Sequence, residues 1–317
     1  MAGALSRASS VALLGVLARV LLLALKGTEM INHVESNMQP NTFVNVQCKK
    51  NQRNQRPVVP KCSTQANKKC GAFLVDNFIN VTEVNQLRNL VHRAMKLGGG
   101  SGGPTILDLQ SGALSKGDKF IDIWRAFDLA GVEPLTKGDV SIYAQVVDRV
   151  AERVAAEFGA RGLHLTAPTF FSRISADLSP VTENDEYWHS HIDTEQYEAF
   201  DYTTLLYLSD TDSDFGGGRL VLDTSGDGLR KTIISPRRGR LLAFSSGPGY
   251  LSPRHHASFD DCAISHYYSF IAEFPHYVEK VSSGTRLALT IAFTCTRAAA
   301  IHKFLDRAAP DKPGQVS

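Results

Sequence analysis

HYVEKVSSGTRLALTIAF, residues 276–293, is the stretch of sequence that decides the fold. It contains two runs rich in β-branched and aromatic residues, separated by serines and a glycine at 282–284, and this composition is typical of a β-hairpin. With the turn centred on Ser282, His276 and Arg286 are expected to share one face of the hairpin. The stretch therefore predicts an antiparallel sheet that presents a histidine and a cation on the same side.

The same β-rich pattern extends through the C-terminal half of the chain. Beyond Gly162, short runs of this kind are separated by turn residues and show no helical periodicity; they span residues 169–174, 203–208, 219–222, 241–244, 277–281 and 286–293. The glycines at 216–218 are expected to make a sharp bend between two of them. Such runs favour an antiparallel sandwich or barrel, and a jelly roll over residues 163–296 is the simplest architecture that closes them.

Amphipathic helices are expected ahead of these strands, within residues 81–158. Apolar residues recur every three or four positions over 81–97 and again over 140–158, and Gly159 is a helix stop. The glycine-rich segment 98–104 lacks the Gly-Lys-Ser/Thr ending of a phosphate-binding loop, so it is interpreted as a flexible connection without chemistry. The predicted fold class is α+β, a jelly-roll core with flanking N-terminal helices.

The N-terminal region of the 317-residue chain differs in composition from the rest. Its apolar run at 11–25 is about 15 residues long, shorter than the roughly 20 that a membrane-spanning helix needs, and is typical of a signal-peptide core. No clear cleavage pair follows it, so residues 1–27 are interpreted as a signal peptide or a retained signal anchor. Residues 28–70, rich in Asn, Gln, Lys and Pro, are interpreted as a polar stalk or linker, and residues 71–317 as the folded domain.

Cysteines and a glycosylation sequence favour the secretory pathway. Cys48, Cys62 and Cys70 lie close together before the folded domain, a spacing that suits disulfide closure of a loop in an oxidising lumen. Asn80-Val81-Thr82 is an acceptor sequence for N-glycosylation. Together with an N-terminal membrane anchor, these features predict a single-pass membrane protein whose folded domain lies in the lumen of the endoplasmic reticulum or Golgi.

The charge balance excludes one class of partner. Lys and Arg number 34 against 32 for Asp and Glu, a formal net charge of +2. No broad positive field is therefore available to hold nucleic acid. The basic run at 49–56 is interpreted as part of the solvated linker, because Gln, Asn and Pro surround its charges.

A candidate metal site lies in residues 186–193, EYWHSHID. In an extended strand, residues i and i+2 project from the same face, so His191 and Asp193 can reach one ion while Ile192 packs the other way. His276, from a distant strand, is the candidate for the third ligand. Two histidines and one carboxylate that leave the other side of the ion open are typical of mononuclear non-haem iron(II) oxygenases.

Two residues that follow His276 predict an acidic ligand beside the metal. A guanidinium can hold a carboxylate through two parallel hydrogen bonds, which lysine cannot match, so Arg286 is the candidate for this contact. Thr290, on the same predicted face, is expected to offer a hydroxyl. His189 and His266 are the substitutes if His276 is not a metal ligand.

Other functions remain open at this point. One is a catalytically silent jelly roll that binds a partner or glycan in the lumen. The other is a zinc hydrolase with the same ligands; it needs a general base, for which Glu186 and Glu195 are the nearby candidates, and it gives Arg286 no role. The leading hypothesis is an iron(II)-dependent oxygenase.

At these residues the chain resembles the prolyl 4-hydroxylase-like group of 2-oxoglutarate and iron-dependent dioxygenases. The likeness covers residues 62–295. It is carried, in this order, by ILDLQSGALS (106–115), LTAPTFFSRI (165–174), the HxD segment (His191 to Asp193), DFGGGR (214–219) and the GTR strand (284–286). Local matches in one order across so much of the chain are specific.

The resemblance implies a set of ligands and a reaction. It implies a double-stranded β-helix core with Fe(2+) bound by His191, Asp193 and His276. It also implies 2-oxoglutarate bound by Arg286, with a hydrogen bond from Tyr207. O2 and 2-oxoglutarate would be cosubstrates, L-ascorbate the reductant, and an unknown protein or small molecule the substrate that is hydroxylated.

Residues 248–274 depart from the family's pattern. They stand as an extra stretch between the predicted strand at 241–244 and His276. This insertion is expected either to form a surface loop over the cavity or to prevent closure of the barrel. The first outcome costs little, because loop-closure entropy grows slowly with loop length.

Overall fold

The computed structural model describes residues 34–46, 62, 69–131, 135–224, 229–246 and 274–301. Residue contacts divide the chain into two compact units, Met1–Val34 and Glu35–Ser317, and the second carries the fold described below. The predicted signal sequence at 1–27 and all of the predicted insertion except Phe274 lie outside the described residues. Within the described part of the chain, no helix is both long enough and apolar enough for a membrane crossing.

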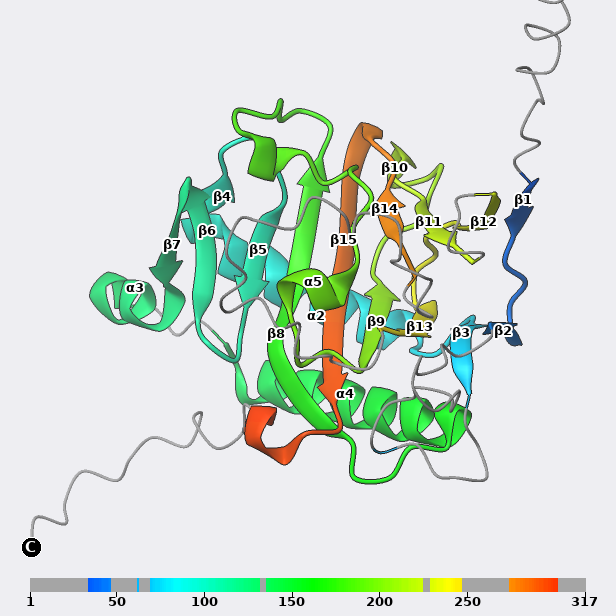
Figure 1. Ribbon diagram of the computed structural model, residues 1–317. Coiled ribbons are helices and arrows are strands. Elements are labelled where there is room, and N and C mark those ends of the chain that lie inside the picture. The colour runs from blue at the N-terminus through cyan, green and yellow to red at the C-terminus, as the bar shows by residue number, and fades with distance from the viewer. Residues whose placement is uncertain are drawn as a thin grey trace, which may run out of the picture. The chain divides into compact units, whose positions relative to one another are not determined.

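The strands of the described chain form an eleven-stranded and a four-stranded sheet (Figure 1). The larger sheet contains, along its main path, β2 (Thr42–Val46), β3 (Cys70–Val75), β13 (Leu241–Ser245), β9 (Tyr202–Tyr207), β15 (Val281–Thr294), β8 (His164–Ser175), β5 (Thr105–Asp108), β6 (Ala113–Gly117) and β4 (Gly99–Gly100), with β10 (Phe215–Gly217) paired to β15 and β7 (Lys119–Asp122) paired to β6. The smaller sheet has the order β1 (Val34–Asn37), β12 (Arg230–Ile234), β11 (Leu220–Asp223) and β14 (His276–Val278). The long strand β15 lies between β8 and β9 and is antiparallel to both.

Two helices, α2 (Val81–Ala94) and α4 (Lys137–Phe158), pack against one face of the larger sheet (Figure 1). Each begins with a capping box, at Asn80 and at Thr136, in which side chains bond the first free amides. Helix α4 ends at Gly159, whose left-handed conformation stops it. Their buried leucines and valines each stabilise the fold by about 1.5–3 kcal/mol. Both predicted helices are confirmed.

The segment between these helices contains more structure than the sequence predicts. The short strands β4 to β7 and the helix α3 (Ile123–Ala130) lie there, and β4 falls within the glycine-rich segment that was expected to be a flexible connection. Each of these strands has only two to five residues. Strands of this length give too few alternating positions for a recognisable pattern.

The other face of the larger sheet packs against the smaller sheet across an apolar interior. The buried residues of this interior include Leu205, Tyr207, Leu242, Phe244 and Ala288 from the larger sheet and Leu220, Leu222 and Ile234 from the smaller. Two antiparallel sheets that enclose one core in this way form a jelly roll. The predicted fold class, α+β with a jelly-roll core and N-terminal helices, is confirmed.

The predicted hairpin at 276–293 is wrong. Strand β14 pairs with β11 of the smaller sheet, and the chain then crosses to the larger sheet as β15. Residues 282–284 lie within β15, where β10 pairs with them, and do not form the expected turn. A glycine is required at position 284 for another reason. Gly284 has a φ of +67°, and a Cβ atom there would lie 2.1 Å from the carbonyl oxygen of Asp214.

Part of the segment interpreted as a stalk belongs to the fold. Strand β2 pairs with β3 along its whole length, and the ring of Phe43 lies 5.4 Å from that of Phe158 on α4. Strand β2 is half exposed and has five residues, TFVNV. Its asparagine interrupts the apolar pattern, so the sequence carried no clear strand signal.

A disulfide joins Cys62 to Cys295, just after the end of β15. The two cysteines are 233 residues apart in sequence. Cys62 therefore does not close a local loop with Cys48 or Cys70, as its spacing suggested. It closes a loop that contains almost the whole folded domain.

Replacing Cys62 and Cys295 by serine is expected to lower the free energy of unfolding by about 2–5 kcal/mol, because the bond limits the conformational entropy of the unfolded chain. Urea denaturation followed by circular dichroism measures this loss. Both single variants break the same bond, so each should lose as much as the double variant. Unchanged stability in either single variant would contradict the role given to the bond.

Candidate metal centre

Three predicted ligands, His191, Asp193 and His276, come together at the edge of the smaller sheet. One ligand atom of each residue lies within 4.8 Å of those of the other two. Nε2 of His276 lies 3.5 Å, and Nε2 of His191 3.9 Å, from Oδ1 of Asp193. The three side chains therefore present two imidazole nitrogens and one carboxylate oxygen to a single point, as the sequence predicts.

Main-chain hydrogen bonds hold the two histidines together. The amide of His191 donates to the carbonyl of His276 at 3.0 Å, and the amide of His276 donates in return at 2.9 Å. This single β-bridge places His191 beside His276 at the outer edge of β14. The HxD segment is thus not the strand that was expected, because Asp193 begins the short helix α5 (Asp193–Gln196). Ile192 between them is extended, so the two ligands still face the same side.

Each histidine is oriented through the ring nitrogen that faces away from the site. Nδ1 of His191 contacts the carbonyl of His189 at 3.0 Å, and Nδ1 of His276 contacts the carbonyl of Phe274 at 2.8 Å. A carbonyl can only accept, so each Nδ1 carries the proton and each Nε2 offers a lone pair toward the site. Burial lowers the pKa of His276, against the opposing charge of Asp193. The neutral imidazole that metal binding requires is thereby favoured.

The second oxygen of the carboxylate ligand is also held. The hydroxyl of Thr203 donates to Oδ2 of Asp193 at 2.5 Å and lies 2.6 Å from the hydroxyl of Ser246. Because the Thr203 proton is used on the carboxylate, Ser246 is the donor in the second contact. This chain of hydroxyls leaves Oδ1 of Asp193 to face the two histidines.

Arg286 lies deep in the domain without an anion of its own. Its residue is 1% exposed, and its Nε donates to the carbonyl of Gly218 at 3.0 Å. Among the described residues, its Nη2 has no hydrogen-bond partner and no carboxylate forms an ion pair with it. A buried cation is costly unless it is paired, so this guanidinium fits the carboxylate of a bound ligand.

Tyrosines surround this guanidinium. Its carbon lies 5.4 Å from the centre of the Tyr207 ring, and the Tyr207 hydroxyl has no hydrogen-bond partner in the described part of the chain. Burial raises the pKa of Tyr207 to about 12, so the phenol stays protonated and can donate. Burial lowers the pKa of Arg286, against the opposing effects of Tyr207 and Tyr187. The Tyr187 hydroxyl accepts from the amide of Val281 at 2.9 Å.

Two neighbouring strands connect the metal ligands to the arginine. Successive residues of a strand alternate between its faces, so Thr203, Leu205 and Tyr207 of β9 share one face. Thr203 contacts the carboxylate ligand at one end of this row, and Tyr207 contacts the guanidinium at the other. Thr290, opposite Leu205, lies on the same face of β15 as Arg286. Its part as a hydroxyl donor stays a prediction.

Of the alternatives considered from the sequence, those that the structure describes do not join the site. His189 is exposed and pairs with Glu186, and Glu195 is also exposed. His266 lies outside the described residues. Sequence reasoning missed Thr203, Ser246 and Tyr187. For Thr203 a signal existed, because it alternates with Tyr207 along one predicted strand, whereas the others are placed only by tertiary contacts.

Two histidines and one carboxylate on a jelly-roll frame, with the far side of the ion left to small molecules, define a mononuclear non-haem iron(II) oxygenase centre. Comparison with known families agrees. Residues 179–294 match the model described as the 2OG-Fe(II) oxygenase superfamily. This part of the chain, which contains His191, Asp193, His276 and Arg286, is a 2OG-Fe(II) oxygenase domain. The family implies Fe(2+) and 2-oxoglutarate, and they fit the triad and the guanidinium, which has no ion-pair partner in the described part of the chain.

Curated relatives extend the likeness beyond this domain. Proteins named 2-oxoglutarate and iron-dependent oxygenase domain-containing protein 3 match 230 residues, at 41% identity in Xenopus tropicalis and 40% in Homo sapiens. The match covers 72% of this chain and 64% and 63% of those relatives, so the chain spans less than two thirds of their length. A solved prolyl hydroxylase from Trichoplax adhaerens is similar over 76% of this chain and 87% of that one, at 16% identity and a TM-score of 0.44.

Alanine in place of His191, Asp193 or His276 is expected to weaken Mn(II) binding by more than about 100-fold, because loss of a ligand should exceed the 10–100-fold effect of losing one of its hydrogen-bond partners. Isothermal titration with Mn(II), used in place of iron, measures this. His189→Ala is the matched control and should bind as the wild type does. The assignment of ligands fails if His276→Ala binds normally.

Proposed function

We propose that this chain is an iron(II)- and 2-oxoglutarate-dependent dioxygenase that hydroxylates a protein or small-molecule substrate with O2. The observation that carries the proposal is the pairing of two features in one domain. A two-histidine, one-carboxylate group lies at one end of a row of β9 side chains, and a buried guanidinium with no counter-ion among the described residues lies at the other. A metal site alone serves many reactions, but an added carboxylate receptor favours a cosubstrate acid.

Each residue of the site would have a binding role that follows from its position. His191, Asp193 and His276 would hold the iron, which, when bound, couples oxidative decarboxylation of 2-oxoglutarate to hydroxylation of the substrate. Arg286 would bind the carboxylate of 2-oxoglutarate that is remote from the metal, and Tyr207 would add a hydrogen bond from its protonated hydroxyl. The apolar residues between the sheets exclude water from this interior, which strengthens both contacts.

The proposal extends to a prolyl 4-hydroxylase-like reaction with L-ascorbate as reductant. Its support is the resemblance of the sequence motifs to that group, together with the relatives' shared oxygenase domain. Ascorbate would return oxidised iron to the ferrous state. The substrate class is to be found by mass spectrometry of lumenal proteins for a gain of one oxygen, with and without the enzyme.

We also propose a lumenal domain of the endoplasmic reticulum or Golgi, held by an N-terminal signal anchor within residues 1–27. The disulfide between Cys62 and Cys295 supports an oxidising compartment. Asn80, in the acceptor sequence, is exposed, and its side-chain oxygen caps α2 by accepting from the amide of Glu83. The nitrogen to which a glycan attaches takes no part in that hydrogen bond.

The wild-type protein is expected to form succinate from 2-oxoglutarate when iron is supplied, and His191→Ala is expected to form none. Arg286→Gln should raise the KM for 2-oxoglutarate by about 10- to 100-fold, because it removes charge-assisted hydrogen bonds worth about 1.5–3 kcal/mol each. The KM of Arg286→Lys should fall between those of the wild type and Arg286→Gln. Neither arginine variant should change the affinity for Mn(II). A wild-type protein that binds Mn(II) but forms no succinate would favour the silent jelly roll.

Full-length protein made in human cells is expected to lose apparent mass on treatment with a peptide N-glycosidase. Thr82→Ala should abolish this shift while it preserves the Asn80 cap, and Thr82→Ser, which keeps the acceptor sequence, should not. Gel electrophoresis measures the shift. A wild-type protein unaffected by the glycosidase would count against lumenal entry of the domain.

A further inference from the structure

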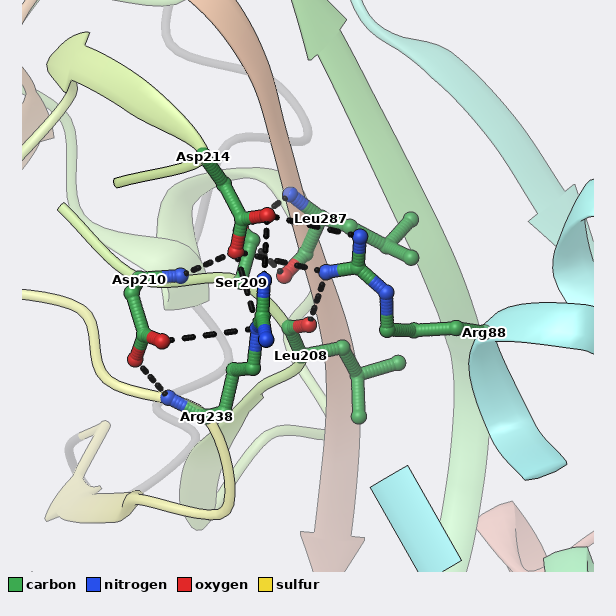
Figure 2. A network of polar contacts seen from close by, with 7 residues as sticks. All are labelled: Arg88, Leu208, Ser209, Asp210, Asp214, Arg238 and Leu287. Carbon is green, nitrogen blue, oxygen red and sulfur yellow. Dashed lines mark hydrogen bonds and ion pairs between the residues drawn. The ribbon is translucent and has the colours of Figure 1, made fainter. Parts of the chain in front are cut away.

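Asp214 lies at the centre of a polar network (Figure 2) that includes Leu287, the residue after Arg286. Its carboxylate accepts from Nε of Arg238 at 2.9 Å and contacts Nη1 of Arg88 at 3.4 Å. It also accepts from the amide of Asp210 at 2.8 Å. Although partial burial raises the pKa of Asp214, the hydrogen bonds from Arg238 and Asp210 and the charge of Arg88 hold it below its ordinary value. The carboxylate stays charged and its side chain is only 15% exposed.

The network connects parts of the chain that are distant in sequence. Arg88 comes from α2, and its Nη1 also donates to the carbonyl of Leu208 at 2.7 Å. Arg238 comes from the loop between β12 and β13, and its amide donates to the carboxylate of Asp210 at 2.6 Å. The segment from Leu208 to Asp214 is therefore held from a helix on one side and from a loop on the other.

This segment in turn contacts both sequence neighbours of Arg286. The carbonyl of Asp214 accepts from the amide of Thr285 at 3.2 Å. On the other side, the hydroxyl of Ser209 accepts from the amide of Leu287 at 2.8 Å, and the amide of Leu208 donates to the Leu287 carbonyl at 2.9 Å. The backbone of β15 is thus fixed immediately before and after the arginine.

The ends of the same segment contact the guanidinium itself. Tyr207, directly before Leu208, lies under the guanidinium, and Gly218, reached through β10, accepts the hydrogen bond from Nε of Arg286. Gly284 must be a glycine because the carbonyl of Asp214 approaches it closely. The two contacts that hold the arginine side chain from this stretch, the Tyr207 ring and the Gly218 carbonyl, therefore lie at its two ends.

We propose that Asp214 is a positioning residue for Arg286: its carboxylate, clamped by Arg88 and Arg238, holds the 207–218 stretch that aims the guanidinium at the cosubstrate acid. The inference rests on the proposed function, because it assigns the anion to 2-oxoglutarate. In this assignment Asp214 acts through the backbone around Arg286 and does not itself bind the acid. The metal ligands are held by other contacts, at Thr203, Ser246 and the paired backbones of the two histidines, so the effect is confined to the acid.

The test uses Asp214→Asn in the full chain, loaded with Mn(II). Its dissociation constant for 2-oxoglutarate, measured by isothermal titration, is expected to rise by about 10- to 100-fold, the range typical of partners that orient a binding group. Its dissociation constant for Mn(II) should match that of the wild type. In turnover, the KM for 2-oxoglutarate should rise by a similar factor with little change in kcat.

Two further variants separate positioning from general loss of stability. Arg238→Gln removes the same clamp from a residue whose side chain is 42% exposed, so it should fold and should weaken 2-oxoglutarate binding in the same direction, by less. Glu83→Gln is the matched control: this carboxylate is 14% exposed, against 15% for Asp214, and its ion pair is with Arg149 of α4, outside the 207–218 stretch. It should leave the affinity for 2-oxoglutarate unchanged.

Hydrogen exchange without ligand gives a readout that does not depend on the proposed function. In Asp214→Asn, the amides of Thr285 and Leu287 should exchange faster, whereas those of β13 should not. Unchanged exchange at both amides, or a normal affinity for 2-oxoglutarate, overturns the positioning role. A wild-type protein that binds Mn(II) but not 2-oxoglutarate overturns the proposed function instead, and the exchange rates then decide the role of Asp214 alone.

Discussion

The pair of hydrogen bonds between the backbones of His191 and His276 is the contact on which the metal site depends. It joins a loop to the edge of the smaller sheet and brings together ligands that lie far apart in the sequence. Since the bonds are made by the main chain, the histidine rings remain free to use Nδ1 on carbonyls and Nε2 on the metal. Asp193 reaches the same point only because Ile192 is extended, so backbone geometry, more than side-chain attraction, assembles the centre.

Two polar groups inside the jelly roll, Asp193 and Arg286, are each held by a partner that leaves another of their atoms for a ligand. Asp193 gives one oxygen to Thr203 and keeps the other toward the histidines. Arg286 gives Nε to Gly218, and its Nη2 has no partner among the described residues. Burying such groups without compensation is unfavourable, so these positions are where a bound iron and a bound acid would complete the structure under the proposed function.

The sequence predicted the fold class and the three residues that converge on one point, but not how the chain connects them. His191, Asp193, His276 and Arg286 were identifiable because few residue types suit iron and a carboxylate, and strand alternation limits which of them can face one cavity. The hairpin was wrong because a Ser-Ser-Gly run is a turn signal in isolation; here Gly284 satisfies a close approach by Asp214, a tertiary constraint. Thr203, Ser246 and the Asp214 network were out of reach for the same reason, since their partners come from other strands.

The position of β15 has a consequence for how the molecule loses its structure. This strand carries Arg286, is hydrogen-bonded along both edges by β8 and β9, and is followed by a cysteine bonded to the start of the domain. Strands paired on both sides open only with the body of the sheet, whereas loops and edges fray separately. The part of the centre that carries Arg286 should therefore persist until the domain unfolds as a cooperative unit, while His191, held to the sheet's edge by a single bridge, can detach earlier.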